Sequence, residues 1–439
     1  MLGSGCEGLT NVLSWPEGKP APIPGLSKSN AEKLAGKSVK SDLSPPSLKK
    51  EIRFIFSCLQ SFVDRRYSEP GLEDSDLLQK LDWNFIVACA RAQRVLPFLG
   101  LALNKATALG KLSGNIQREI ERSLHHAEWE NTVKRMQFEK IRQIFARENI
   151  PIIPLKGIAL THLVYRENPI RMMGDVDIFI KQKDLPNVCR LLEEKDFKLE
   201  GLVSDWQDAM SRRFIGRWGY VKEGLNADIQ WQPRFLIRGH LVEWDYRQAW
   251  ERASPCRELG SNVFMLSPLD LSRYLLLQIA NDFECNIPFL IQFLDLALVM
   301  KNENLAREDI LGEGIPDLHS AARDRLQGLL GVVQECFLET ECFSKFSKDT
   351  QEVLESLLNG NRNISDLFGL RSFFQMTHSF RERFIFMAGY FFPSRRYLED
   401  TYGRSWLALL SGYFKHLGRL LVKTGSLMKT VWRRDDDFR

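Results

Sequence analysis

The stretch Gly174-Asp175-Val176-Asp177-Ile178-Phe179-Ile180 decides how the rest of this chain is interpreted. Side chains two residues apart on a strand point to the same face, so Asp175 and Asp177 converge at the start of a strand whose remainder is apolar. Two carboxylates held that close repel each other unless a positive charge lies between them. A hard divalent cation bound by oxygen ligands is the usual resident. For an isolated Asp-x-Asp, the alternative is an exposed turn before a strand.

The residues ahead of this stretch predict a phosphate-binding turn. Segment 151–155 predicts a short apolar strand, and Lys156-Gly157 begins a helix directly after it. A glycine at a strand-to-helix junction lets a phosphate approach backbone amides, and a helix N-terminus attracts negative charge. Lys156 adds a positive charge there, and Arg171 lies in a loop four residues before Asp175. Lys156, Gly157 and Arg171 are therefore candidates for phosphate binding. Alternatively, Lys156 lines the strand edge and Arg171 pairs with an acid.

A third carboxylate follows on another predicted strand. The sequence Asn226-Ala227-Asp228-Ile229-Gln230-Trp231 alternates as a strand does, and Asp228 shares a face with Gln230. Segment 213–222 is also strand-like, so Glu223-Gly224 predicts the turn of an antiparallel pair.

The order of these elements resembles the nucleotidyltransferase superfamily of the polymerase-beta type. More narrowly, Leu-Lys-Gly at 155–157, Arg171 with the Asp-x-Asp, the Asp-Ile-Gln-Trp strand and Leu-Asp-Leu-Ala at 294–297 resemble the bacterial uncharacterised nucleotidyltransferase family. Members of that family often lie among polysaccharide-biosynthesis genes. The chain departs from the pattern at Lys156-Gly157-Ile158, where the superfamily has Gly-Gly or Gly-Ser. It also has Gln230 where the family often has histidine.

The resemblance implies an α+β fold with a small mixed β-sheet nucleotidyltransferase core, flanked by N-terminal and C-terminal helical regions. It implies transfer of a nucleoside monophosphate from a nucleoside triphosphate to a hydroxyl acceptor that the sequence does not identify. Asp175, Asp177 and Asp228 would be catalytic and would bind Mg²⁺ or Mn²⁺. A catalytically silent binding or scaffold module on the same fold is the alternative, and so is a peripheral membrane component of a glycan-assembly system.

Composition limits the partners. The chain has 439 residues, 60 basic against 56 acidic side chains and a net charge of +4. This balance argues against bulk nucleic acid as a partner. The eight cysteines show no metal-finger spacing, which indicates free thiols in a reducing compartment. We found no secretory signal and no membrane-spanning stretch, so we expect a cytoplasmic protein.

The length and patterning predict four regions. Residues 1–45 should be a disordered arm, 46–149 an N-terminal helical region, 150–266 the catalytic core and 267–439 a C-terminal helical region. Within these, segment 112–148 predicts one long helix with a core-facing apolar stripe. Asp295 lies in a predicted helix, either at the surface or reaching a basic residue near the site. The basic amphipathic pattern of 413–434 predicts a helix that packs on the protein or, alternatively, lies on an anionic membrane surface.

Overall fold

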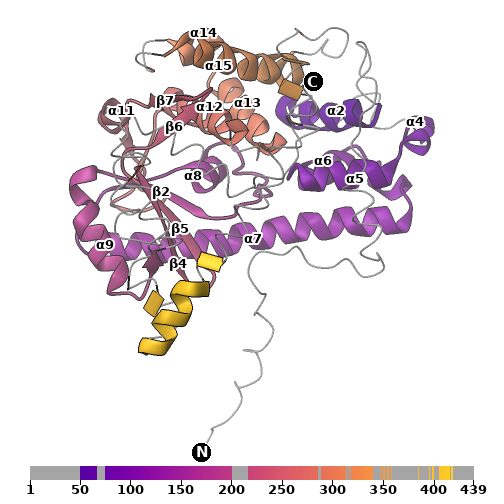
Figure 1. Ribbon diagram of the computed structural model, residues 1–439. Helices are drawn as coiled ribbons and strands as arrows, with labels where there is room; N and C mark the ends of the chain where they lie inside the picture. Colours follow the sequence, from indigo (N-terminus) through magenta and orange to yellow (C-terminus); the bar gives the residue numbers. More distant parts are fainter. Residues whose placement is uncertain are drawn as a thin grey trace, which may run out of the picture. The chain divides into compact units, whose positions relative to one another are not determined.

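A small mixed sheet surrounded by helices carries the Asp-x-Asp segment in the computed structural model of the chain (Figure 1). The structure describes residues 50–66, 75–199, 216–284, 288–312, 315, 318–339, 347, 350–351, 353–354, 357, 384, 395, 398–399, 405–415 and 417–418. The predicted arm at 1–45 therefore lies outside the described residues. So does most of the predicted amphipathic tail. The expected α+β class, a mixed sheet with helical regions before and after it, is confirmed.

Along the chain, helices come before, within and after the segment that forms the sheet. Those before it are α2 (Lys50–Asp64), α4 (Ser75–Lys80), α5 (Trp83–Ala92), α6 (Leu96–Lys105) and α7 (Gly114–Ala146). Within the sheet region lie α8 (Lys156–Leu163), α9 (Leu185–Glu193) and α11 (Tyr246–Arg252). The helices after it are α12 (Pro268–Glu284), α13 (Leu290–Asn302), α14 (Arg307–Leu311) and α15 (Ser320–Val333), which a single π-helical turn continues over Gln334–Leu338.

The main sheet has the strand order β1-β2-β5-β4-β3. Its members are β1 (Ile152–Pro154), β2 (Val176–Ile180), β3 (Lys198–Leu199), β4 (Arg217–Lys222) and β5 (Leu225–Gln230). β2 and β5 are parallel, and every other neighbouring pair is antiparallel. The predicted hairpin turn forms at Glu223-Gly224, where both residues have positive φ (48° and 77°), as the primed turns of two-residue hairpins require. Two further hairpin-like pairs join β6 (Arg234–Ile237) with β7 (His240–Glu243) and β8 (Ser254–Pro255) with β9 (Phe264–Met265).

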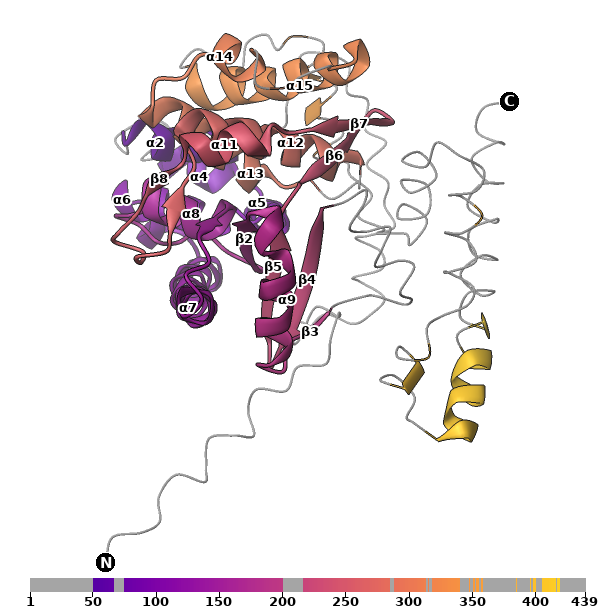
Figure 2. The ribbon, with the colours of Figure 1, turned by 90° about the vertical axis from the view of Figure 1, so that its left-hand side faces the viewer.

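The two faces of β2 and β5 are buried against different helices. One face carries Val176, Ile178 and Ile180 into a core shared with α7 and α9, whose contributions include Phe138 and Val188. Figure 2 shows α9 beside this part of the sheet. The opposite face carries Asp177, Phe179, Asp228 and Gln230, because strand side chains alternate. Phe179 packs there with the core of α12 and α13. The acids thus lie on the face of the sheet that meets the C-terminal helices.

Two predictions about helices were wrong in part. The long helix at 112–148 is confirmed as α7, but Trp129 and Met136 of its predicted core stripe are 55% and 60% exposed. The middle of α7 buries Asn131 and Lys134 instead, since that part of the helix faces polar residues near Arg171. The predicted turn at 281–286 begins too early, because α12 continues to Glu284 and Asp282 keeps two side-chain hydrogen bonds within the helical region.

Candidate active site

Asp177 and Asp228 are direct neighbours on two parallel strands. They are register partners in the β2–β5 pair, so both side chains leave the same face of the sheet at the same level. Gln230 connects them: its Nε2 donates to Asp177 Oδ1 at 3.2 Å and to Asp228 Oδ2 at 2.9 Å. Tyr274 of α12 donates its hydroxyl hydrogen to Gln230 Oε1 at 3.1 Å. The residue that replaces the family's histidine therefore holds the two carboxylates in a fixed relation.

Asp175 lies just before β2 and is exposed, whereas Asp177 is only 3% exposed. Desolvation, followed by the nearby charge of Asp175, raises the pKa of Asp177 to about 7, although Lys156 acts in the opposite direction. Desolvation also raises the pKa of Asp228, against the lowering effect of Arg217 and Lys156. The structure thus brings all three predicted acids into mutual electrostatic range, and their negative charge is incompletely balanced.

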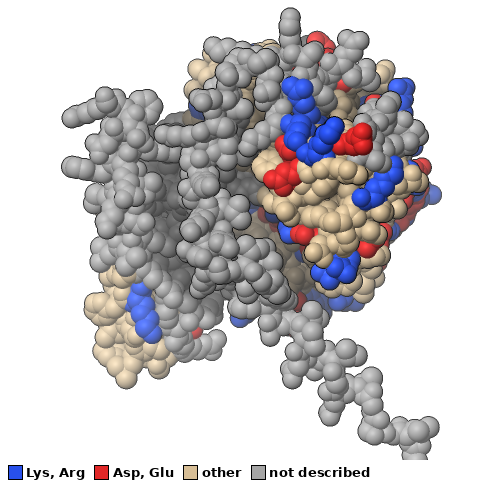
Figure 3. All heavy atoms as spheres, turned by 90° about the vertical axis from the view of Figure 1, so that its right-hand side faces the viewer, with Lys and Arg blue, Asp and Glu red and all other residues tan. Residues whose placement is uncertain are grey.

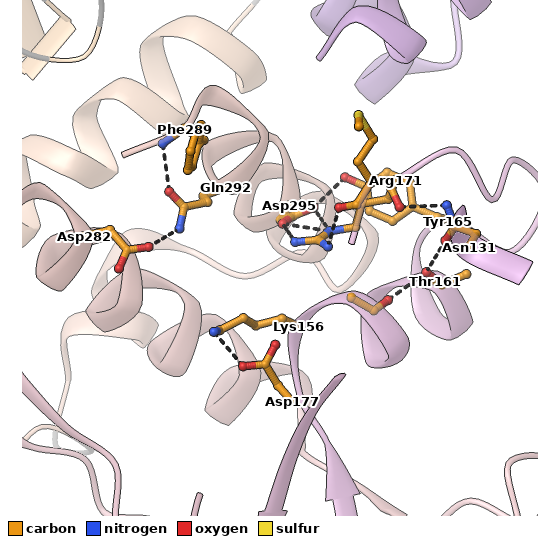
Figure 4. Close-up of polar contacts among 12 residues, drawn as sticks. Asn131, Lys156, Thr161, Tyr165, Arg171, Asp177, Asp282, Phe289, Gln292 and Asp295 are labelled. Atoms are coloured by element: carbon orange, nitrogen blue, oxygen red, sulfur yellow. Dashed lines mark hydrogen bonds and ion pairs between the residues drawn. The ribbon is translucent and has the colours of Figure 1, made fainter. Parts of the chain in front are cut away.

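Lys156 supplies the cation closest to the acids. Its Nζ lies 2.7 Å from Asp177 Oδ1, and Figure 4 shows the two side chains pointing toward each other. Desolvation alone would lower the pKa of Lys156, but Asp177 and the other acids outweigh it and raise that pKa well above its usual range. The backbone of Lys156 has a φ of 42°, which non-glycine residues rarely adopt. The predicted phosphate ligand is therefore held as a charged partner of Asp177 by a strained strand-to-helix junction.

Arg171 is held by a buried carboxylate of α13. Its Nη2 lies 2.6 Å from Asp295 Oδ2, its Nε donates to both Asp295 oxygens, and Tyr165 donates to Asp295 Oδ1 at 2.8 Å (Figure 4). Arg171 and Asp295 are 7% and 1% exposed. Of the two alternatives for Asp295, the structure shows the one in which it reaches a basic residue. Of those for Arg171, it shows the pairing with an acid, and phosphate binding by Arg171 remains a prediction.

Packing favours glycine at position 157, independently of whether a phosphate approaches the backbone there. A Cβ at this position would lie 2.4 Å from Met173 Sδ, 2.5 Å from Met173 Cγ and 3.2 Å from Arg171 Nη1. Met173 is buried, at 3% exposure, and belongs to the core beneath the sheet. The absence of a side chain at Gly157 therefore allows the loop before Asp175 to lie directly against the start of α8.

We expect Gly157→Ala to lower the free energy of unfolding by about 1–3 kcal/mol, the usual cost of overpacking a filled core. Urea denaturation measures this loss. Gly110→Ala is the matched control, because nothing lies within 4 Å of the Cβ it would add. A second change, Met173→Ala, should recover part of the loss, because it removes the clashing atoms. Equal stability of the two glycine variants would contradict this explanation.

Several polar residues near the acids were missed by the sequence analysis. Arg217 Nη1 lies 4.0 Å from Asp228 Oδ2. Asp282 of α12 accepts hydrogen bonds from Gln278 and Gln292, and desolvation raises its pKa against the influence of Lys156. Tyr274 reaches the site from nearly two helix turns after the start of α12. None follows a motif, since Arg217 depends on the pairing of β4 with β5 and the other two depend on where α12 lies against the sheet.

The donor set fits a hard divalent cation chemically. Carboxylate oxygens are the ligands that Mg²⁺ and Mn²⁺ prefer. Burial and then the charge of Asp175 raise the pKa of Asp177, and a bound cation would favour its charged form. In the part of the chain that the structure describes, however, no group of three His, Cys, Asp or Glu side chains is placed closely enough to hold an ion. Binding by all three acids therefore requires their side chains to move together.

The face of the molecule in Figure 3 carries charges of both signs. Where described residues are visible there, Lys and Arg side chains alternate with Asp and Glu over short distances. Within the described residues, no helix is long and apolar enough to cross a membrane. The described helical residues 406–415 expose Trp406, Leu407, Leu410 and Phe414, but most of the predicted amphipathic tail lies beyond them.

Comparisons with known proteins identify a family whose sequence model matches this chain. The family model described as "Uncharacterised nucleotidyltransferase" matches residues 79–314, more than half of the chain. A comparison with curated proteins finds no match. One solved structure, the solution structure of the antibiotic-resistance factor ANT(2″)-Ia, is 12% identical and covers 41% of this chain and 88% of its own. Its TM-score is 0.29, and a likeness of that size carries no argument here.

Proposed function

Because the chain belongs to the uncharacterised nucleotidyltransferase family, we propose that it transfers a nucleoside monophosphate group from a nucleoside triphosphate to a hydroxyl acceptor, in a reaction that depends on Mg²⁺ or Mn²⁺. The observation that carries the proposal is the register pairing of Asp177 with Asp228, which Gln230 bridges by hydrogen bonds. The exposed Asp175 lies two residues before Asp177. Enzymes that transfer phosphoryl groups with divalent ions use such carboxylates as ligands of the ions.

In this proposal Asp175, Asp177 and Asp228 would hold the divalent ion. When bound, the ion would supply charge neutralisation around the α-phosphate, from which pyrophosphate leaves as the acceptor oxygen bonds to phosphorus. Asp228 orients the attacking hydroxyl and accepts its proton at the carboxylate that Gln230 fixes through Oδ2. Lys156 and the start of α8 at Gly157 would stabilise the charge that develops on the phosphate oxygens. Arg171 contributes by its fixed positive charge behind the loop that carries Asp175.

The proposal also includes the location of the protein, the acceptor and contact with a membrane surface. The expected cytoplasmic location rests on the sequence alone, whose eight cysteines show no metal-finger spacing. The acceptor is proposed only as a hydroxyl compound, with a sugar of a polysaccharide-assembly system among the classes to be tested. Binding to a membrane surface through the C-terminal basic segment remains a prediction from the sequence.

The test is transfer of label. The full-length protein is incubated with each α-labelled nucleoside triphosphate, Mg²⁺ or Mn²⁺, and fractionated cell extract. We expect label on one acceptor class, loss of labelling with EDTA and recovery when the ion is added back. A protein that binds the nucleotide but labels nothing in any fraction would instead favour the catalytically silent module.

A further inference from the structure

Two cations near Asp175 have no ion-pair partner among the described residues. Lys156 and Arg171 each lie beside a carboxylate, at 2.7 Å and 2.6 Å. Arg94 and Lys134 lie within no salt-bridge distance of any described acid. Both come from the N-terminal helical region and therefore from outside the segment 150–266 that we predicted as the catalytic core. Unpaired cations beside a cluster of acids are expected to serve an anion that is not part of the protein.

Lys134 lies on the inward face of α7. It is 9% exposed, and Asn131, three residues earlier on the same face, donates to the backbone oxygen of Arg171 at 2.7 Å. This bond fixes α7 against the loop that leads to Asp175. Desolvation lowers the pKa of Lys134, whereas Asp175 is the largest of the charges that raise it. The stem of Lys134 is thus packed, and its ammonium group is close enough to Asp175 to interact with it electrostatically.

Arg94 lies between α5 and α6, and its guanidinium is above the ring of Phe289, 4.1 Å from the ring centroid. The neighbouring Gln93 accepts a hydrogen bond from the backbone N–H of Leu290 at 2.9 Å. This contact ties the loop to the start of α13, whose Asp295 holds Arg171. Desolvation and then the charge of Arg171 lower the pKa of Arg94, while Asp175 and Glu130 raise it. Arg94 is an exposed residue, unlike Lys134, but Asp175 and Glu130 act electrostatically on both.

We propose that Arg94 and Lys134 bind the β- and γ-phosphates of the nucleoside triphosphate, opposite the acids of the sheet. The inference rests on the proposed function and adds to it a substrate-binding role for the N-terminal helical region. The polyphosphate chain then lies between the acids, which would hold the divalent ion, and two cations that have no salt-bridge partner among the described residues. A guanidinium fork and an ammonium point charge are both common phosphate ligands.

Glu130 gives this inference an independent test. It lies one helix turn before Lys134, and its Oε2 is buried without a hydrogen-bond partner. Both Arg94 and Lys134 act electrostatically on Glu130, whose pKa desolvation raises. A carboxylate in this position attracts the two cations when no phosphate is present and repels a phosphate that binds to them. Removing its charge should therefore strengthen phosphate binding, which a merely structural role would not produce.

The experiment measures binding of inorganic tripolyphosphate to the full-length protein by calorimetry in the presence of Mg²⁺. We expect Arg94→Met and Lys134→Met each to weaken binding about tenfold, as the loss of one charged hydrogen bond does. Glu130→Gln should tighten it. Arg122→Met and Lys140→Met are matched controls, since both are exposed residues of α7, and they should bind as the wild type does. Melting temperatures of all variants establish that the fold is kept.

The outcomes separate this inference from the proposed function. If the wild type releases pyrophosphate from a nucleotide but Arg94→Met and Lys134→Met bind tripolyphosphate like the controls, the inference is overturned and the function stands. A wild type that does not bind tripolyphosphate also overturns it. If binding depends on Arg94 and Lys134 although no pyrophosphate is ever released, the inference stands and nucleotidyl transfer fails.

Discussion

Asp177→Asn should reduce nucleotidyl transfer by at least about a thousandfold, within the range that loss of an essential charged catalytic group produces. Asparagine keeps the shape of the side chain and can still accept from Lys156 and Gln230, but it cannot carry the negative charge that holds a divalent ion. Asp228, its register partner, should show a similar loss as Asp228→Asn.

The same substitution should leave the protein as stable as before, or more stable. Burial raises the folded-state pKa of Asp177 above its ordinary value. An acid whose pKa is raised on folding opposes folding once the pH exceeds its unfolded pKa, because the folded state must then hold an unfavourable charge. Asparagine removes that cost at neutral pH, although it also leaves Lys156 with only the more distant acids.

Pyrophosphate release and thermal unfolding, measured on the same preparations, test both statements. Asp196→Asn is the matched control, because its side chain is 89% exposed and lies away from the sheet face that carries Asp177. It should keep full activity and stability. Full activity of Asp177→Asn would remove Asp177 from the catalytic site, and unfolding of the variant would make its role structural.

The second large effect is expected at the Arg171–Asp295 pair. Asp295→Ala leaves the Arg171 guanidinium buried without its carboxylate and leaves Tyr165 without its acceptor. Breaking a buried pair in this way typically costs about 3–5 kcal/mol. Urea denaturation should therefore show a large decrease in the free energy of unfolding.

A double variant distinguishes charge burial from lost packing. Arg171→Met with Asp295→Leu removes both charges and fills similar volume, so it should recover most of the lost stability. Asp324→Ala on α15 is the control, since Asp324 is exposed, and should change stability by less than about 0.5 kcal/mol. If Asp295→Ala were as stable as this control, the pair would not anchor α13 to the loop before Asp175.

The sequence predicted those features of the site that depend on a single strand or turn. Alternation along a strand placed Asp228 and Gln230 on one face, and the Asp-x-Asp before an apolar run identified β2. Glu223-Gly224 identified the hairpin turn because it separates two strand-like segments and contains a glycine, which adopts positive φ readily. These features depend on residues within a few positions of each other, so the pattern alone is informative.

What the sequence could not predict depends on how distant elements meet. Lys156 was correctly placed at the helix start, but its contact with Asp177 depends on the antiparallel pairing of β1 with β2. Arg94 and Lys134 carry no motif, and Lys134 interrupts an apolar stripe that was expected to face the core. Gln230 was noted only as a departure from the family's histidine, whereas its position between the two acids follows from the parallel register of β2 and β5.

One measurement tests the central claim most directly: pyrophosphate release from each nucleoside triphosphate by the full-length protein, with Mg²⁺ and cell extract, compared with the Asp177→Asn/Asp228→Asn double variant. The account predicts release with at least one nucleotide and none above background in the variant. Release that is equal in the two proteins, or absent from the wild type with every nucleotide, would contradict the claim that these acids form a nucleotidyl-transfer site.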